Sequence, residues 1–418
     1  LAHGLHVDLG QAAGLQLVRP GGEWIMRVFA DEVPRVRELL PPQVLLQKCT
    51  TTTKMHPVRD DGGLGMETLV APPAGFFRRG VSGVKPALRS FLRKAGPEMH
   101  LLIMVSQEKK ERLQSIMRKL GVEEAHWTVH PVAEHRLREW VRDQFVAGRE
   151  VQESPQQRKY VSASQQRKGP VDRVLAEIGF QRLKELLPIE GGNLIAGNGV
   201  VFFGKISVID WAAAYGISEQ EAEEEIAIVF DTQNLVVIGT DESIDSHILM
   251  RYEVQAGDNY QPAVHIDLFL AVLGEGANGE MEVVLGDPVS IPGEHGLPIS
   301  ERMRGIFSEI ERCLKSMGMV VHRMLLPYLN DRSTGPYFAS GVNVLLGRDG
   351  GRRVLWLPQY GNSADPEDPL HATDAQVLRR WSEILPDGVE IRKVPDMWVF
   401  ARFRGGLRCI TKVIDRKP

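Results

Sequence analysis

The residues whose types and spacing could support covalent chemistry stand near the end of the chain, where Cys409 follows Arg404-Gly405-Gly406-Leu407-Arg408. Glycine adopts backbone conformations closed to other residues and lets a ligand come close, so the double glycine suits a loop that lines a pocket. A thiolate is a strong nucleophile, which makes Cys409 a candidate for covalent catalysis. The alternative interpretation is a buried structural cysteine in a final strand, the commoner role of a lone cysteine.

Three upstream segments carry titratable groups that could serve such a nucleophile. They are Trp140-Val141-Arg142-Asp143, Glu190-Gly191-Gly192-Asn193 and His265-Ile266-Asp267. We predict a strand over residues 265–273, on which His265 and Asp267 point to the same face. Two polar groups on one face of an apolar strand are costly to bury unless that face lines a site.

Each of these groups also has an ordinary structural explanation. Glu190 could cap a turn, and Asp143 could pair with its neighbour Arg142. His265 could be a hydrogen-bonded histidine of the core. Together with a cysteine, however, the segments supply a nucleophile, a base and three carboxylates, which favours an active site.

The bulk composition narrows the class of protein. The 418 residues are 43% hydrophobic and 25% charged, which is typical of a soluble globular protein. A net charge of −4 argues against a general nucleic-acid binder, and the apolar runs are too short to span a membrane. Three cysteines are too few for a disulfide framework, so we expect a reducing, cytoplasmic compartment, although a chain that starts at Leu1 leaves room for a removed leader. CxxC and HExxH patterns are absent, so we predict neither a metal site nor a cofactor.

A pattern of two strands, a helix and a strand recurs along the chain. The expected elements are strands at 65–71, 100–105, 127–132, 193–196, 199–203, 235–239, 265–273, 281–285, 319–326, 342–346, 353–357 and 389–394, with helices at 107–120, from Ser218, at 300–317 and from Thr373. Ser218 with Glu221, and Thr373 with Gln376, are predicted capping boxes. Four units are clear and one N-terminal unit is doubtful. Each is too small to close its own core, so we predict one α/β domain over 1–418.

Some segments do not fit this pattern. Residues 1–60 are poorly readable, with strands expected at 15–18 and 23–29 and a short helix at 33–40. An insert at 76–98 is rich in Arg and Lys, and could meet an acidic partner or a substrate carboxylate or be a solvated surface. A second insert, 144–175, contains Gln-Gln-Arg-Lys twice and is predicted to be a flexible loop or flap. The GxGxxG match at 274–279 precedes a strand rather than a helix, so we interpret it as a hairpin turn and not a dinucleotide site.

Taken together, the motifs resemble the guanidino-group-modifying, or pentein, superfamily, which contains arginine, agmatine and peptidylarginine deiminases, dimethylargininases and amidinotransferases. The resemblance covers roughly residues 95–418 and rests on WVRD at 140–143, IEGGN at 189–193 followed by Gly197-Asn198-Gly199, HID at 265–267, LPQYG at 357–361 and GGLRC at 405–409. It implies a pentein-type α/β propeller of ββαβ units around a pseudo-fivefold axis. The residue before the cysteine is Arg408, as in arginine deiminases, whereas agmatine and peptidylarginine deiminases often have His there.

The resemblance also implies roles for the acids and for two other polar residues. A guanidinium is planar, always charged and offers five N–H donors, so removing it from water requires carboxylates in bidentate geometry. By resemblance, Asp143 and Asp267 hold the guanidinium and Asn193 takes part in substrate binding. Arg408, or the basic insert, could clamp the carboxylate of a free amino acid.

The catalytic roles implied by the resemblance fall on three residues. Cys409 attacks the guanidinium carbon and forms a covalent thiouronium. His265, oriented by Glu190, protonates the departing amine and then deprotonates the incoming water. Hydrolysis yields a ureido product and ammonia without a cofactor.

Two alternatives and the substrate remain open at this stage. An amidinotransferase would pass the amidino group to an amine instead of water, and a pentein-fold binding protein would have lost the chemistry. The partner is a small guanidino compound (arginine, agmatine or a methylarginine) or an arginyl peptide, with neither nucleic acid nor membrane expected. A homo-oligomer is compatible with the sequence.

Overall fold

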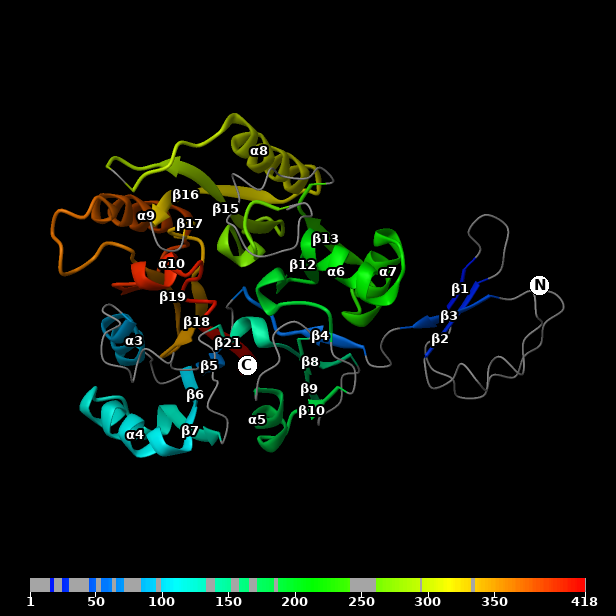
Figure 1. The fold of residues 1–418 in the computed structure, drawn as a ribbon, viewed down its shortest axis with the longest axis horizontal. Helices are drawn as coiled ribbons and strands as arrows, with labels where there is room; N and C mark the ends of the chain where they lie inside the picture. The colour runs from blue at the N-terminus through cyan, green and yellow to red at the C-terminus, as the bar shows by residue number, and fades with distance from the viewer. Residues whose placement is uncertain are drawn as a thin grey trace.

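A computed structural model of the chain shows how the predicted elements are arranged (Figure 1). The residues that it describes are 16–18, 25–29, 45–49, 54–61, 65–70, 84–94, 99–132, 140–151, 158–164, 171–183, 187–240, 261–293, 295–331 and 335–417.

Four sheets share one topology, in which an antiparallel strand pair is followed by a helical connection and a strand parallel to the second. Their elements are β8 (Phe145–Glu150), β9 (Lys159–Ala163), α5 (Val171–Glu177) and β10 (Gln181–Arg182); β11 (Leu194–Gly197), β12 (Val200–Gly204), α6 (Lys205–Tyr215), α7 (Glu219–Val229) and β13 (Asn234–Ile238); β14 (Leu270–Glu275), β15 (Met281–Ser290), α8 (Glu301–Ser316) and β16 (Val320–Asp331); and β18 (Leu345–Asp349), β19 (Arg352–Pro358), α9 (Leu370–Ile384) and β20 (Glu390–Val394). This is the predicted unit of two strands, a helix and a strand.

A fifth sheet repeats the topology with strands from both ends of the chain. The last strand, β21 (Thr411–Lys417), pairs antiparallel with β5 (Gly65–Val70). After α3 (Val84–Arg93), β6 (Met99–Ser106) runs parallel to β5, and β7 (Trp127–Val132) is added after α4 (Lys110–Lys119). Cys409 lies two residues before β21, so this pairing of chain ends determines where the cysteine is presented.

The remaining strands extend two sheets or stand beside the body of the molecule. β17 (Gly335–Phe338) adds to β16, and β4 (Met55–Pro57) adds to β8. β1 (Gln16–Val18), β2 (Ile25–Phe29) and β3 (Leu45–Cys49) pair only with one another among the described strands and stand apart in Figure 1. The helix predicted at 33–40 lies outside the described residues.

One cluster of buried apolar side chains connects four of the five repeated sheets, all except the sheet of β8, β9 and β10. It contains Leu101 of β6, Phe202 of β12, Trp356 of β19 and Ile410 just before β21, all fully buried. Because the units contribute to one cluster, burial of apolar surface in one unit stabilises its neighbours. Among the described helices, no helix has the length and apolarity that crossing a membrane requires.

Several local predictions are confirmed. Ser218 caps α7, where its hydroxyl accepts from Glu221 N and Glu221 closes the capping box. Ser300 caps α8. The glycine run at 274–279 joins β14 to β15 as an antiparallel hairpin and opens no helix.

The strand predicted over 265–273 is wrong at its start. His265 is extended, but Ile266–Leu268 forms a 3₁₀ turn and β14 begins only at Leu270. The reason is that Asn193 Oδ1 accepts a hydrogen bond from Ile266 N at 3.2 Å, which replaces a ladder bond. The alternative interpretation that places Cys409 within a final strand is wrong as well, because the cysteine lies in a turn that precedes β21.

Other corrections concern helices and the inserts. The capping box expected at Thr373 is absent because α9 begins earlier, where Asp368 Oδ1 accepts from Leu370 N at 2.9 Å. The 144–175 insert contains β8, β9 and most of α5 rather than a flap alone, since β9 buries its apolar residues against the sheet. α6 and the short α10 (Trp398–Arg402) were not predicted.

Candidate active site

Five tight turns, one before the first strand of each repeated sheet, deliver the predicted site residues. Three are 3₁₀ turns, Arg142–Gln144, Gly191–Asn193 and Ile266–Leu268, and the second contacts the other two. The fourth closes where Asn343 N donates to Ser340 O at 3.2 Å, and the fifth where Thr411 N donates to Arg408 O at 3.1 Å. Equivalent positions of a repeated unit therefore converge, although they lie far apart in the sequence.

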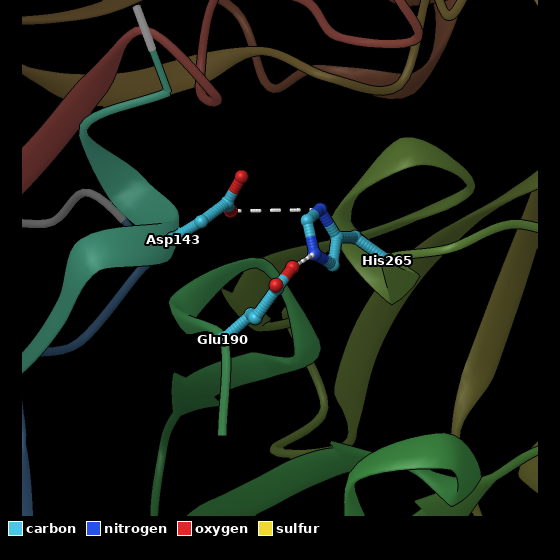
Figure 2. A group of neighbouring side chains, drawn as sticks. All are labelled: Asp143, Glu190 and His265. Atoms are coloured by element: carbon cyan, nitrogen blue, oxygen red, sulfur yellow. Dashed lines mark hydrogen bonds and ion pairs between the residues drawn. The ribbon is translucent and has the colours of Figure 1, made fainter. Parts of the chain in front are cut away.

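His265 stands between two carboxylates (Figure 2). Its Nε2 lies 2.5 Å from Glu190 Oε2, and its Nδ1 lies 3.5 Å from Asp143 Oδ1. All three side chains are buried. The two acids come from different turns, so the imidazole is fixed in orientation from both sides.

The glycines next to Glu190 are required by close approach. A Cβ on Gly192 would lie 2.6 Å from the His265 ring, and one on Gly191 would lie 2.1 Å from Arg142 O. Any side chain at these positions would push the imidazole or the Arg142 turn away.

Asn193 holds the backbone that carries His265. Its Nδ2 donates to Val264 O at 3.1 Å, and its Oδ1 accepts from Ile266 N at 3.2 Å and from Gln261 Nε2 at 2.9 Å. These contacts give Asn193 a positioning role, and its predicted contact with substrate stays a prediction.

Cys409 is buried beside Asn343, a residue that the sequence motifs did not include. Asn343 Nδ2 lies 2.9 Å from Asp267 O and 3.6 Å from Cys409 Sγ, and its Oδ1 accepts from Arg408 N at 2.7 Å. One amide group thus bridges the backbones that carry Asp267 and the cysteine. A Cβ on Gly406 would lie 2.5 Å from Asn343 Oδ1, which explains the second glycine of the double-glycine run.

Asp267 is fully buried, and neither of its carboxylate oxygens has a hydrogen-bond donor among the described residues. Its charge is met by Arg142, whose Nε lies 2.9 Å from Asp267 Oδ2 in an ion pair without hydrogen-bond geometry. A buried carboxylate without donors is costly, so this side chain is expected to accept hydrogen bonds from a ligand.

The two arginines of the motifs share a further acid. Arg142 Nη1 lies 3.5 Å and Arg408 Nη2 lies 2.7 Å from Asp60 Oδ1. Both arginine side chains are buried. The contact with Asp60 favours a positioning role for Arg408, and its role as a carboxylate clamp stays a prediction.

The acids determine the protonation states of the site. Burial alone would lower the pKa of His265, but Asp143 and Glu190 outweigh it and raise the pKa to about 9. Burial, Asp267 and Asp143 raise the pKa of Cys409 well above its ordinary value. At neutral pH His265 is therefore an imidazolium and Cys409 a thiol.

The group of Asp143, Glu190 and His265 could also be considered for a metal ion. Their ligand atoms lie within 4.8 Å of one another. Each histidine nitrogen faces a carboxylate, and the raised pKa keeps the imidazole protonated, whereas a metal needs a neutral imidazole with a free nitrogen. The arrangement fits a proton-transfer group better than a metal site.

Comparison with known proteins supports the fold. No family model and no curated protein matches the sequence. Agmatine deiminase of Campylobacter jejuni superposes with a TM-score of 0.57 at 14% identity, covering 86% of this chain and 95% of that one. Agmatine deiminase of Enterococcus faecalis gives a TM-score of 0.54 at 16% identity, covering 87% and 96%. A protein described as a peptidyl-arginine deiminase gives 0.58 at 14%, covering 87% and 99%.

These similarities confirm the predicted resemblance at the level of the fold. The chain has the mixed α/β fold of the guanidino-group deiminases over nearly its whole length. Sequence identities this low do not indicate which substrate is bound or which reaction is catalysed, because both depend on the residues of the site.

Protonation of His265 predicts a pH-dependent contribution to stability. Its pKa is raised from 6.5 to about 9 on folding, so the stabilisation is complete below about pH 6.5 and is lost as the pH rises towards 9. The free energy of unfolding of the wild type minus that of His265→Asn should fall by on the order of 3 kcal/mol across this window. Urea denaturation of both proteins at several pH values measures the difference, and a constant difference would contradict the raised pKa.

Asn343→Ala should damage both stability and the site. It leaves the buried backbone groups Arg408 N and Asp267 O without the Asn343 amide as their partner, and each unpaired group costs about 1–3 kcal/mol of stability. Alkylation of Cys409 by a neutral haloacetamide should also change, because its sulfur loses a donor. Denaturation and mass-spectrometric alkylation rates test this, with Asn330→Ala on β16 as the control. An unchanged alkylation rate would show that Asn343 acts on the fold alone.

Proposed function

We propose that the protein is a cysteine hydrolase of the guanidino group, a deiminase. The observation that supports it most directly is the buried Asp267 carboxylate without hydrogen-bond donors among the described residues, next to a cysteine and a histidine held between two acids. A guanidinium supplies what this carboxylate lacks, several N–H donors and a positive charge. We also propose that the five repeated sheets form a propeller around a pseudo-fivefold axis, which the pairing of β21 with β5 favours.

In the proposed complex the substrate cation lies between Asp143 and Asp267 and in front of Cys409. These two acids are among the causes that raise the pKa of the Cys409 thiol. A bound cation offsets their charge, so the thiol can lose its proton to solvent when substrate binds. The substrate thereby activates the nucleophile that attacks it.

In the first half-reaction the Cys409 sulfur forms a bond to the guanidinium carbon. His265 is already protonated, so it can give its proton to one terminal nitrogen, which leaves as ammonia. The carbon–nitrogen bond breaks and a covalent thiouronium remains on the sulfur. Glu190 and Asp143 stabilise the imidazolium before transfer.

In the second half-reaction the neutral His265 takes a proton from water, and the oxygen adds to the thiouronium carbon. The carbon–sulfur bond breaks and the thiolate departs, while the added hydroxyl group loses its proton to solvent and the neutral ureido product is released. The imidazolium and the thiolate of the first step are regenerated, so no cofactor is consumed.

Cys409→Ser should lower turnover at least 1,000-fold, since the hydroxyl is a far weaker nucleophile than a thiolate. Ammonia and ureido product released from arginine, agmatine, methylarginine and an arginyl peptide are measured in parallel. Cys313→Ser, at the exposed free cysteine of α8, is the matched control and should retain activity. A new guanidino compound without ammonia would instead indicate an amidinotransferase, and turnover by Cys409→Ser would contradict the proposal.

The charge of the ligand should decide how fast Cys409 reacts. 2-Chloroacetamidine carries a flat cation, whereas 2-chloroacetamide is neutral, and both lose chloride when sulfur attacks the methylene carbon. We expect the cationic reagent to label Cys409 at least about 10-fold faster near pH 7.5, since a bound cation stabilises the thiolate. Cys313 in the same molecule is the internal reference. Equal rates at Cys409 would argue against a guanidinium site.

A further inference from the structure

A second group of charges, centred on Asp60, adjoins the predicted site through Arg142, and no sequence motif includes that aspartate. In the sequence, Asp60 lies between β4 and β5. Its backbone N donates to Ala196 O at 2.6 Å, and its Oδ2 accepts from Ala196 N at 3.1 Å. The carboxylate is therefore held against β11, the strand that follows the Glu190 turn.

Asp60 and Asp267 share one guanidinium. Arg142 directs Nε towards Asp267 at 2.9 Å, while its Nη1 and Nη2 lie 3.5 Å from the two oxygens of Asp60. Arg142 Nη2 also donates to Leu194 O at 2.8 Å, which anchors that end. The Nη end of the guanidinium thus meets Leu194 O and both oxygens of Asp60, and Nε alone meets Asp267, at the shortest of the three ion contacts.

The charges around Asp60 make its ionised form stable. Burial would raise the pKa of Asp60, but Arg408, Arg142 and Lys412 outweigh it and hold the pKa well below its usual range. Asp60 is therefore an anion at neutral pH. Its negative charge balances cations that would otherwise be drawn to the next carboxylate, Asp267.

We propose that Asp60 is a positioning residue for guanidinium binding: by sharing Arg142 with Asp267, it leaves the Asp267 carboxylate able to accept the hydrogen bonds of the substrate. The inference rests on the proposed function, in which Asp267 binds the guanidinium. Without the Asp60 charge, Arg142 keeps only one carboxylate at these contacts, turns more of its donors towards Asp267 and competes with the substrate for it.

The test uses the ratio of two labelling rates at Cys409 in the full chain, 2-chloroacetamidine over 2-chloroacetamide. Asp60→Asn keeps the shape of the side chain and removes its charge. We expect the ratio to fall about 10-fold or more, with the neutral reagent reacting no more slowly than in the wild type. KM for a guanidino substrate should rise by a similar factor while kcat changes less than about threefold.

Two further variants separate positioning from loss of stability. Asp349→Asn removes a carboxylate that pairs with Arg392 at the end of β18 and is 3% exposed, against 10% for Asp60, and it should leave the ratio within about twofold. Asp60→Asn with Arg408→Met removes one charge of each sign, which keeps the net buried charge unchanged. Its ratio should still fall, because Arg142 has still lost its second acid.

Each outcome decides the inference. An unchanged ratio in Asp60→Asn, an equal fall in Asp349→Asn, or a wild-type ratio near one overturns it. A fall confined to the Asp60 variants supports it, even if the wild-type protein converts no guanidino compound, in which case only the proposed function fails. If the wild type converts a guanidino compound and the labelling ratio of Asp60→Asn equals that of the wild type, the deiminase function stands and the positioning role of Asp60 is rejected.

Discussion

The site depends on burying several carboxylates around a single imidazole. Asp143 and Glu190 face the two nitrogens of His265, and Asp267 lies nearby with no hydrogen-bond donor among the described residues. Concentrated negative charge out of water is unstable unless cations meet it. Here the imidazolium and Arg142 meet part of that charge, and the remainder defines the chemical character of the ligand, a cation with several N–H donors.

The repeated topology explains how such a group of charges can be assembled. Each of the five sheets begins with a tight turn, and each turn faces a common region where a side chain of special chemistry is presented. Acids come from three of the turns, the Asn343 amide group from the fourth and the thiol from the fifth. The asparagines Asn193 and Asn343 bind backbone from neighbouring turns, so the turns are held to one another by buried hydrogen bonds rather than by the acids alone.

Much of this organisation was predictable, because hydrophobic periodicity and turn residues identify strands and helices that pack on a shared core. The ββαβ units, the glycine hairpin at 274–279 and the capping box of α7 followed from such local patterns. The turn at His265 did not, because the side chain of Asn193, 73 residues before Ile266, supplies its hydrogen bond. Asn343 was missed as well, although its place two residues before β18 matches that of Asp143 before β8, and Asp60 lies in a segment with little periodicity.

The protonation states of the site affect how well the Cys409 thiol is protected from oxidation and alkylation. The acids that would bind a cation also raise the pKa of the Cys409 thiol, so nucleophilicity and ligand binding are coupled through one set of charges. Oxidation and alkylation require thiolate character, and a buried thiol without it is protected until a cation arrives. A cationic side chain held next to the Cys409 sulfur before substrate binds would remove this protection and would also repel the cationic substrate. That conflict gives a physical reason for Arg142 and Arg408 to be paired with Asp60: Arg142 lowers the pKa of the Cys409 thiol, but burial, Asp267 and Asp143 outweigh it.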